Sequence, residues 1–97
     1  MGVKISSSTE KKLLEKHNVT REEIIECFTN QDRYALKDTR ENNQTDPPTL
    51  WIISETNHLR RLKVIFMVKD GDAVVKSAYE PEEEAEYIYN NKAPYVF

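Results

Sequence analysis

Apolar and polar residues alternate with a period of two in the second half of the chain. The segment 49–55 is rich in β-branched and aromatic residues, and in 60–68 every second residue is apolar. An Asp70-Gly71 pair then precedes a third apolar run over 73–79, and Asp-Gly between two such runs is typical of a tight hairpin. The pattern predicts three antiparallel strands in these segments. A weaker alternation over 33–38 adds a marginal fourth.

Helical spacing of apolar residues appears at both ends of the chain. The pattern predicts a helix that opens at Ser8 and stops at Asn18, followed by a second helix over about 20–29. Thr20 and Glu23 have the spacing of a capping box, in which each side chain bonds the other residue's amide. Pro81 is expected in the first turn of a last helix, and residues 40–48 are expected to form a polar loop.

These elements predict an α+β fold. We expect an antiparallel sheet of three to four strands with two N-terminal helices and one C-terminal helix. The length of 97 residues predicts a single domain over 1–97, with a core at about 9–92 and both ends flexible.

Composition narrows the function classes. The N-terminus has no apolar signal region, and no apolar run approaches the roughly 20 residues of a membrane span. We therefore expect a cytoplasmic protein that does not associate with a membrane. Cys27 is the one cysteine, which argues against a disulfide or a zinc site. Gly2 and Gly71 cannot build a glycine-rich phosphate loop. We therefore expect neither a metal nor a cofactor.

The net charge of −3 is unevenly spread, since a basic zone precedes an acidic C-terminal segment. Arg61 and Lys63 lie on one face of a predicted strand, and Lys76 lies on its hairpin partner. Cleavage of RNA through its 2′-OH needs cations for the developing phosphorane charge and groups that move protons. The candidate catalytic residues are Arg60, Arg61, Lys76 and Tyr79. The alternative is a solvated strand face whose lysines and arginines have no catalytic role.

The remaining candidates surround this set. Lys63, His58 and Lys16 are the candidate RNA-binding residues. His58 falls in the turn before Arg60, where a solvent-facing role competes with one in proton transfer. His17 ends the first helix, where packing and the helix dipole favour a structural role. Cys27 is expected to be a small buried apolar residue rather than a nucleophile.

Several of these segments together resemble the BrnT family of toxins from type II toxin–antitoxin modules, within the wider RelE-like ribonuclease group. The stretch Lys16-His17-Asn18-Val19 is similar to that family's lysine–histidine–glycine–valine junction, and 60–66 is similar to its arginine and apolar strand segment. The resemblance covers roughly 10–90. It implies a compact sheet with helices, ribonuclease activity, and an antitoxin partner that covers the active surface. The expected antitoxin is of the ribbon-helix-helix type. The other matching segments are Cys27-Phe28, 75–78 and 86–89.

The sequence departs from the family pattern at three places. Tyr79 stands where an arginine usually follows Ser77-Ala78, and Thr49-Leu50 precedes Trp51 where an arginine is usual. Asn18 replaces the glycine that usually follows the histidine. Two family-typical cations are therefore missing, and loss of a single donor in such a site costs about 3–4 kcal/mol of transition-state stabilisation.

Three functions follow as hypotheses. The first is a toxin-like, metal-independent endoribonuclease. The second is a non-catalytic RelE-like module that binds a protein partner or RNA. The third is a small dimerising domain whose contact uses Trp51, Tyr34 and the tail 95–97. The expected assemblies are a homodimer or a toxin–antitoxin hetero-oligomer.

Overall fold

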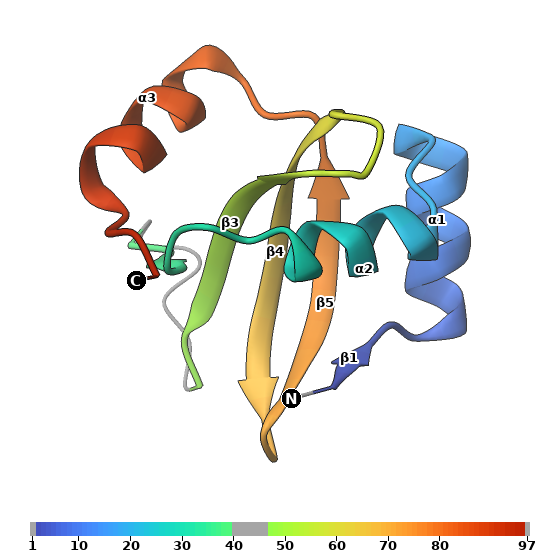
Figure 1. Cartoon of the computed structure of the whole chain (residues 1–97). Coiled ribbons are helices and arrows are strands. Elements are labelled where there is room, and N and C mark those ends of the chain that lie inside the picture. Colours follow the sequence, from blue (N-terminus) through green and yellow to red (C-terminus); the bar gives the residue numbers. More distant parts are fainter. Residues whose placement is uncertain (1, 40–46, 97) are drawn as a thin grey trace.

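A computed structural model describes residues 2–39 and 47–96. Its centre is a five-stranded sheet with the strand order β1-β5-β4-β3-β2 (Figure 1). The strands are β1 (Val3–Lys4), β2 (Leu36–Lys37), β3 (Thr49–Glu55), β4 (Arg61–Lys69) and β5 (Asp72–Tyr79), and the helices are α1 (Ser7–His17), α2 (Arg21–Thr29) and α3 (Glu83–Lys92).

The three long strands form the predicted antiparallel centre. β3 pairs with β4 from Thr49↔Met67 to Glu55↔Arg61, and β4 pairs with β5 through the tight turn at Asp70-Gly71. The register of β5 shifts where Ile65 and Phe66 meet it, so β5 carries an extra residue at a bulge. The α+β class and these three strands are therefore confirmed.

The sheet differs from the expectation in size and in direction. It has five strands rather than three to four, and it is mixed, because β1 runs parallel to β5 with Val3 opposite Ala73. β1 has only two residues, too few to show a period, and its pairing is fixed by distant groups. The Gly2 amide donates to Asp72 Oδ1 at 2.9 Å, and the Ala73 amide donates to the Gly2 carbonyl at 2.8 Å. The sheet thus includes residues that precede the expected 9–92 core.

Helices pack against both faces of the sheet. Phe28 of α2 meets Phe66 edge to face, with ring centroids 5.1 Å apart. Tyr89 of α3 lies 5.5 Å from Trp51, whose neighbour Ile65 points away from the Phe66 face. The Tyr89 hydroxyl also donates to the carbonyls of Arg33 and Tyr34, at 3.1 Å each. α2 and α3 therefore cover opposite faces.

The helix ends follow local signals, with two corrections. The capping box at Thr20 and Glu23 is present. α1 begins at Ser7 with Ser6 as its N-cap, one residue before the predicted start at Ser8, and Asn18 ends it in the left-handed conformation. α3 begins at Glu83, so Pro81 precedes the helix instead of standing in its first turn.

The C-terminal tail docks against the segment before β2. Arg33 forms an isolated bridge with Tyr95, and its guanidinium carbon lies 4.2 Å from the Tyr95 ring centroid. The expected strand over 33–38 is thus reduced to Leu36–Lys37, since Arg33 pairs with the tail instead. Of the predicted polar loop at 40–48, residues 40–46 lie outside the described part of the chain, as does Phe97. None of the helices among the described residues is long and apolar enough to cross a bilayer.

The β4–β5 turn gives a test of this fold. Asp70 and Gly71 have φ values of 52° and 82°, the mirror-image turn in which glycine carries no steric cost. We predict that Gly71→Ala lowers the free energy of unfolding by about 1 kcal/mol, measured by chemical denaturation. Asp70→Asn tolerates the same conformation, so its stability should stay within about 0.5 kcal/mol of wild type. Equal stability of Gly71→Ala and wild type would contradict the turn type.

Candidate functional site

Arg60 joins four segments of the chain at the end of the sheet where β4 begins. Its Nη1 lies 3.0 Å from Glu23 Oε2, and its Nε donates to Glu80 Oε1 at 3.3 Å. The same guanidinium donates to the carbonyl oxygens of His17 and Asn18, at 3.1 and 2.8 Å. One side chain therefore holds the end of α1, the start of α2 and the end of β5 together.

Electrostatics reinforce this junction. Burial alone would raise the pKa of Glu23, but hydrogen bonds from the Thr20 amide and from Arg60 bring that pKa below its ordinary value. Burial opposes the charge of Arg60 as well, yet the Glu23 carboxylate raises the Arg60 pKa. Both groups are therefore held charged, as an ion pair whose side chains are only about a quarter exposed.

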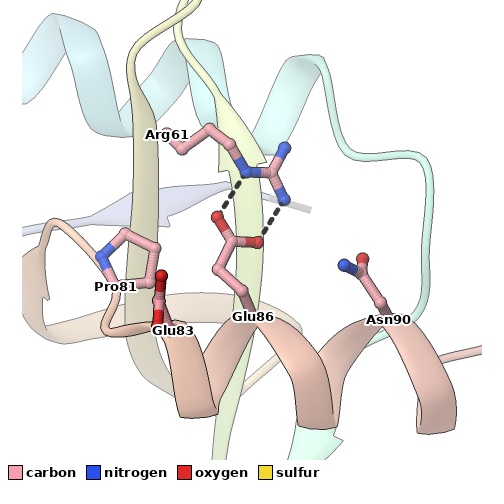
Figure 2. A pocket seen from close by; sticks show the side chains of 5 residues that line it. All are labelled: Arg61, Pro81, Glu83, Glu86 and Asn90. Carbon is pink, nitrogen blue, oxygen red and sulfur yellow. Dashed lines mark hydrogen bonds and ion pairs between the residues drawn. The ribbon is translucent and has the colours of Figure 1, made fainter.

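Arg61 points to the opposite face and binds α3. Its Nε and Nη2 donate to the two carboxylate oxygens of Glu86, at 2.7 and 2.8 Å, in a bidentate pair (Figure 2). Glu55 adds a weaker contact at 3.4 Å. The Glu86 hydrogen bonds raise the Arg61 pKa, against the effect of burial. Arg61 also lines a shallow cavity with Pro81, Glu83 and Asn90, where carboxylates lie beside its cation.

Lys63, Tyr79 and His17 form a row across the same end of the sheet. Lys63 and Tyr79 are direct neighbours on β4 and β5, and the Lys63 ammonium lies 6.0 Å from the Tyr79 ring centroid. The Tyr79 ring also meets the imidazole of His17, with ring centroids 5.4 Å apart. His17 is exposed, and Lys63 and Tyr79 are half-buried. An imidazole, a phenol and an ammonium are thus accessible side by side.

The other predicted residues do not join this row through any contact among the described residues. Lys76 is exposed on β5 and is the extra residue of the bulge, between Val75 opposite Phe66 and Ser77 opposite Ile65. Lys16 is exposed in the last turn of α1, next to His17 in the chain. His58 is exposed in the turn between β3 and β4, where its amide donates to Thr56 Oγ1 at 3.2 Å.

His17 belongs to this row, although its residue type and position at a helix end predicted a structural role. A lone histidine at a helix end gives no sign of a partner, because Tyr79 lies 62 positions away in the sequence. The available signal was the similarity of Lys16-His17-Asn18-Val19 to the BrnT junction. His17 is one of the residues that this similarity matches.

Two further sequence interpretations concern buried residues. Cys27 is fully buried, and burial raises its thiol pKa to about 12, which suits a small apolar residue and not a nucleophile. Trp51 is 8% exposed beneath Lys63 and against Tyr89, so it is not available for the predicted dimer contact. Tyr34 and Tyr95 are exposed. Within residues 2–39 and 47–96, no group of three histidine, cysteine or acidic side chains is arranged to hold a metal ion.

Comparison with known proteins places this geometry in a known fold. No protein-family model matches the chain, and no curated protein does. Among solved structures, the chain is similar to the BrnT ribonuclease toxin of Brucella abortus, with a TM-score of 0.62 and 19% sequence identity. The match covers 86% of this chain and 99% of the toxin. The chain therefore has the BrnT fold, as the sequence resemblance implied.

The Arg60–Glu23 pair predicts a pH-dependent stability. Because folding lowers the Glu23 pKa, the contribution of this carboxylate is present at neutral pH and is lost as pH falls through the lowered value, below the ordinary 4.5. We predict that Glu23→Gln lowers the free energy of unfolding by about 1 kcal/mol at pH 7, while glutamine keeps the capping box. The difference from wild type should shrink toward pH 3. A difference that is constant from pH 7 to 3 would contradict the pairing.

Proposed function

We propose that this protein is a toxin-like ribonuclease that cleaves RNA without a metal ion. The row of His17, Tyr79 and Lys63 carries the proposal, because it combines proton-transfer groups with a cation on an accessible surface. The likeness to a ribonuclease toxin supports it. At 19% identity that likeness concerns the fold, so the chemistry rests on this chain's own residues.

The proposed reaction uses each member of the row once. His17 accepts the proton of the ribose 2′-OH, and the 2′-oxygen attacks the adjacent phosphorus. The phosphorus–5′-oxygen bond breaks, and the Tyr79 hydroxyl donates a proton to the leaving 5′-oxygen. Lys63 stabilises the extra negative charge on the phosphorane. The products are a 2′,3′-cyclic phosphate and a 5′-hydroxyl, and imidazole suits the first step because it exchanges protons readily near neutral pH.

The two arginines receive a different role in this proposal from the one the sequence favoured. Each is already matched by carboxylates, Arg60 by Glu23 and Glu80 and Arg61 by Glu86. An RNA phosphate would have to displace those partners, so we assign Arg60 and Arg61 to positioning. Lys16, Lys76 and His58 are exposed, and we assign them to contacts with the RNA backbone.

The proposal extends to a partner and to a setting. A toxin acting on RNA in the cytoplasm needs a protein that covers its active surface, and we propose an antitoxin in that role, of the ribbon-helix-helix type. We retain the RelE-like ribonuclease group as the wider assignment. The single-domain organisation over 1–97 is part of the same proposal.

A second candidate function is that of a binding module that does not cleave RNA. Both arginines are held by carboxylates and the net charge is −3, which favours a binding module without catalysis. Such a module would bind RNA with a steep salt dependence and release no products. If it binds no RNA at all, its ligand would be a protein.

The test is RNA digestion in the presence of EDTA. We predict that the wild-type protein cleaves single-stranded RNA and leaves 2′,3′-cyclic phosphate ends. His17→Ala and Tyr79→Phe should each lower the rate by about 10²-fold or more, and Lys63→Ala by a similar factor. Lys69→Ala removes an exposed lysine at the far end of β4 and should cleave as wild type does.

Two results would contradict the proposal. One is intact RNA after incubation with wild-type protein at high concentration, and the other is undiminished cleavage by His17→Ala and Tyr79→Phe. Retained binding without products would favour the second function.

A further inference from the structure

A cavity lies between α3 and the β2–β3 edge of the sheet. Its volume is about 530 Å³, within the range of small-molecule sites. Leu36, Trp51, Ala85 and Ile88 give it an apolar lining. The remaining described lining residues are polar, namely Lys37, Asp38, Thr39, Lys63, Glu82, Glu84 and Lys92.

Lys63 links this cavity to the proposed catalytic row. Its ammonium lies 4.5 Å from the Trp51 ring centroid, on the cavity side, and 6.0 Å from the Tyr79 ring centroid, on the side of the row. A phosphate bound at Lys63 would therefore have the cavity on one side and His17 with Tyr79 on the other. A base and its own phosphate are covalently joined, so a nucleotide whose base enters the cavity brings its phosphate toward Lys63.

The lining suits a flat aromatic molecule that carries both hydrogen-bond donors and acceptors. Apolar side chains can contact the faces of a base, while the ammonium groups of Lys37 and Lys92 can donate to acceptors. The exposed carboxylates of Glu82 and Glu84 can accept hydrogen bonds. Among the four RNA bases, guanine places the acceptors O6 and N7 on one edge and an N2 amino donor on another.

We propose that this cavity binds a guanine base of single-stranded RNA and so sets where the strand is cut. The inference rests on the proposed ribonuclease function, because it assigns the cavity to the same substrate. With the guanine seated under α3 and its phosphate on Lys63, the bond beside that nucleotide lies at His17 and Tyr79. Cleavage is then selective for bonds adjacent to guanine. An apolar side chain of a protein partner is the other occupant that the test can reveal.

Binding can be measured without any cleavage. Trp51 is the single tryptophan of the chain and it lines the cavity, so its fluorescence reports on occupancy. We predict that guanosine 5′-monophosphate changes this fluorescence saturably. Its affinity should exceed that of the adenosine, cytidine and uridine monophosphates by about tenfold.

Two pairs of variants locate the site. Ala85→Phe fills the cavity and should abolish the fluorescence response, whereas Asn91→Phe adds the same bulk at an exposed position of α3 and should keep it. Glu84→Ala removes a lining carboxylate and should weaken guanosine monophosphate binding about fivefold or more. Glu83→Ala removes an equal charge from a residue outside this cavity and should leave the affinity unchanged. If Ala85→Phe does not fold, the Glu84 and Glu83 pair decides.

The proposal is overturned by equal affinity for the four nucleotides, or by guanosine binding that Ala85→Phe and Glu84→Ala leave unchanged. A fluorescence change produced by a copurifying protein partner instead of a nucleotide would also overturn it. Failure of the ribonuclease function gives a different result, which is selective guanosine binding together with intact RNA. Cleavage that ignores guanine, equal in wild type and Glu84→Ala, would reject the base pocket and leave the ribonuclease standing.

Discussion

The position of α1 and α2 at the end of β5 depends on the guanidinium of Arg60, which is bound at once by two carboxylates and two backbone carbonyls. These partners are Glu23, Glu80 and the carbonyl oxygens of His17 and Asn18. An arginine presents several donors in a rigid planar fork, so a single side chain can satisfy acceptors from different segments. The result is that the last residue of α1 is fixed near the last residue of β5, which is Tyr79.

The two arginines and Lys63 have different surroundings. Arg60 and Arg61 are neutralised by carboxylates and hold α1, α2 and α3 against the sheet. The Lys63 ammonium lies 4.5 Å from the Trp51 ring centroid and 6.0 Å from the Tyr79 ring centroid, and the faces of both rings attract its charge. The missing family cations are thus compatible with a site built on one lysine, an imidazole and a phenol.

The sequence predicted the elements whose causes are local. The period-two alternation over 60–68, the Asp70-Gly71 turn and the Thr20 capping box all depend on neighbours within a few residues. The parallel pairing of Val3 with Ala73 depends on contacts 70 residues apart, so a two-residue strand left no pattern to read.

For the site, Lys63 and Tyr79 were both candidates by residue type, and the register of β4 and β5 makes them direct neighbours. The carboxylates that bind the arginines could not be foreseen, because Glu23 and Glu86 lie on separate helices far along the chain. His17 was placed beside Tyr79 by the same long-range junction.

Arg60 holds His17 and Tyr79 in contact, and the NMR chemical shifts of the His17 ring protons test this contact most directly. In the wild-type protein the Tyr79 ring should displace these proton shifts from the values seen in Tyr79→Leu. Arg60→Lys keeps the positive charge but loses the planar guanidinium donors. In that variant the His17 ring shifts should move to the Tyr79→Leu values while most backbone shifts are retained. Wild-type ring shifts in a folded Arg60→Lys protein would contradict the account.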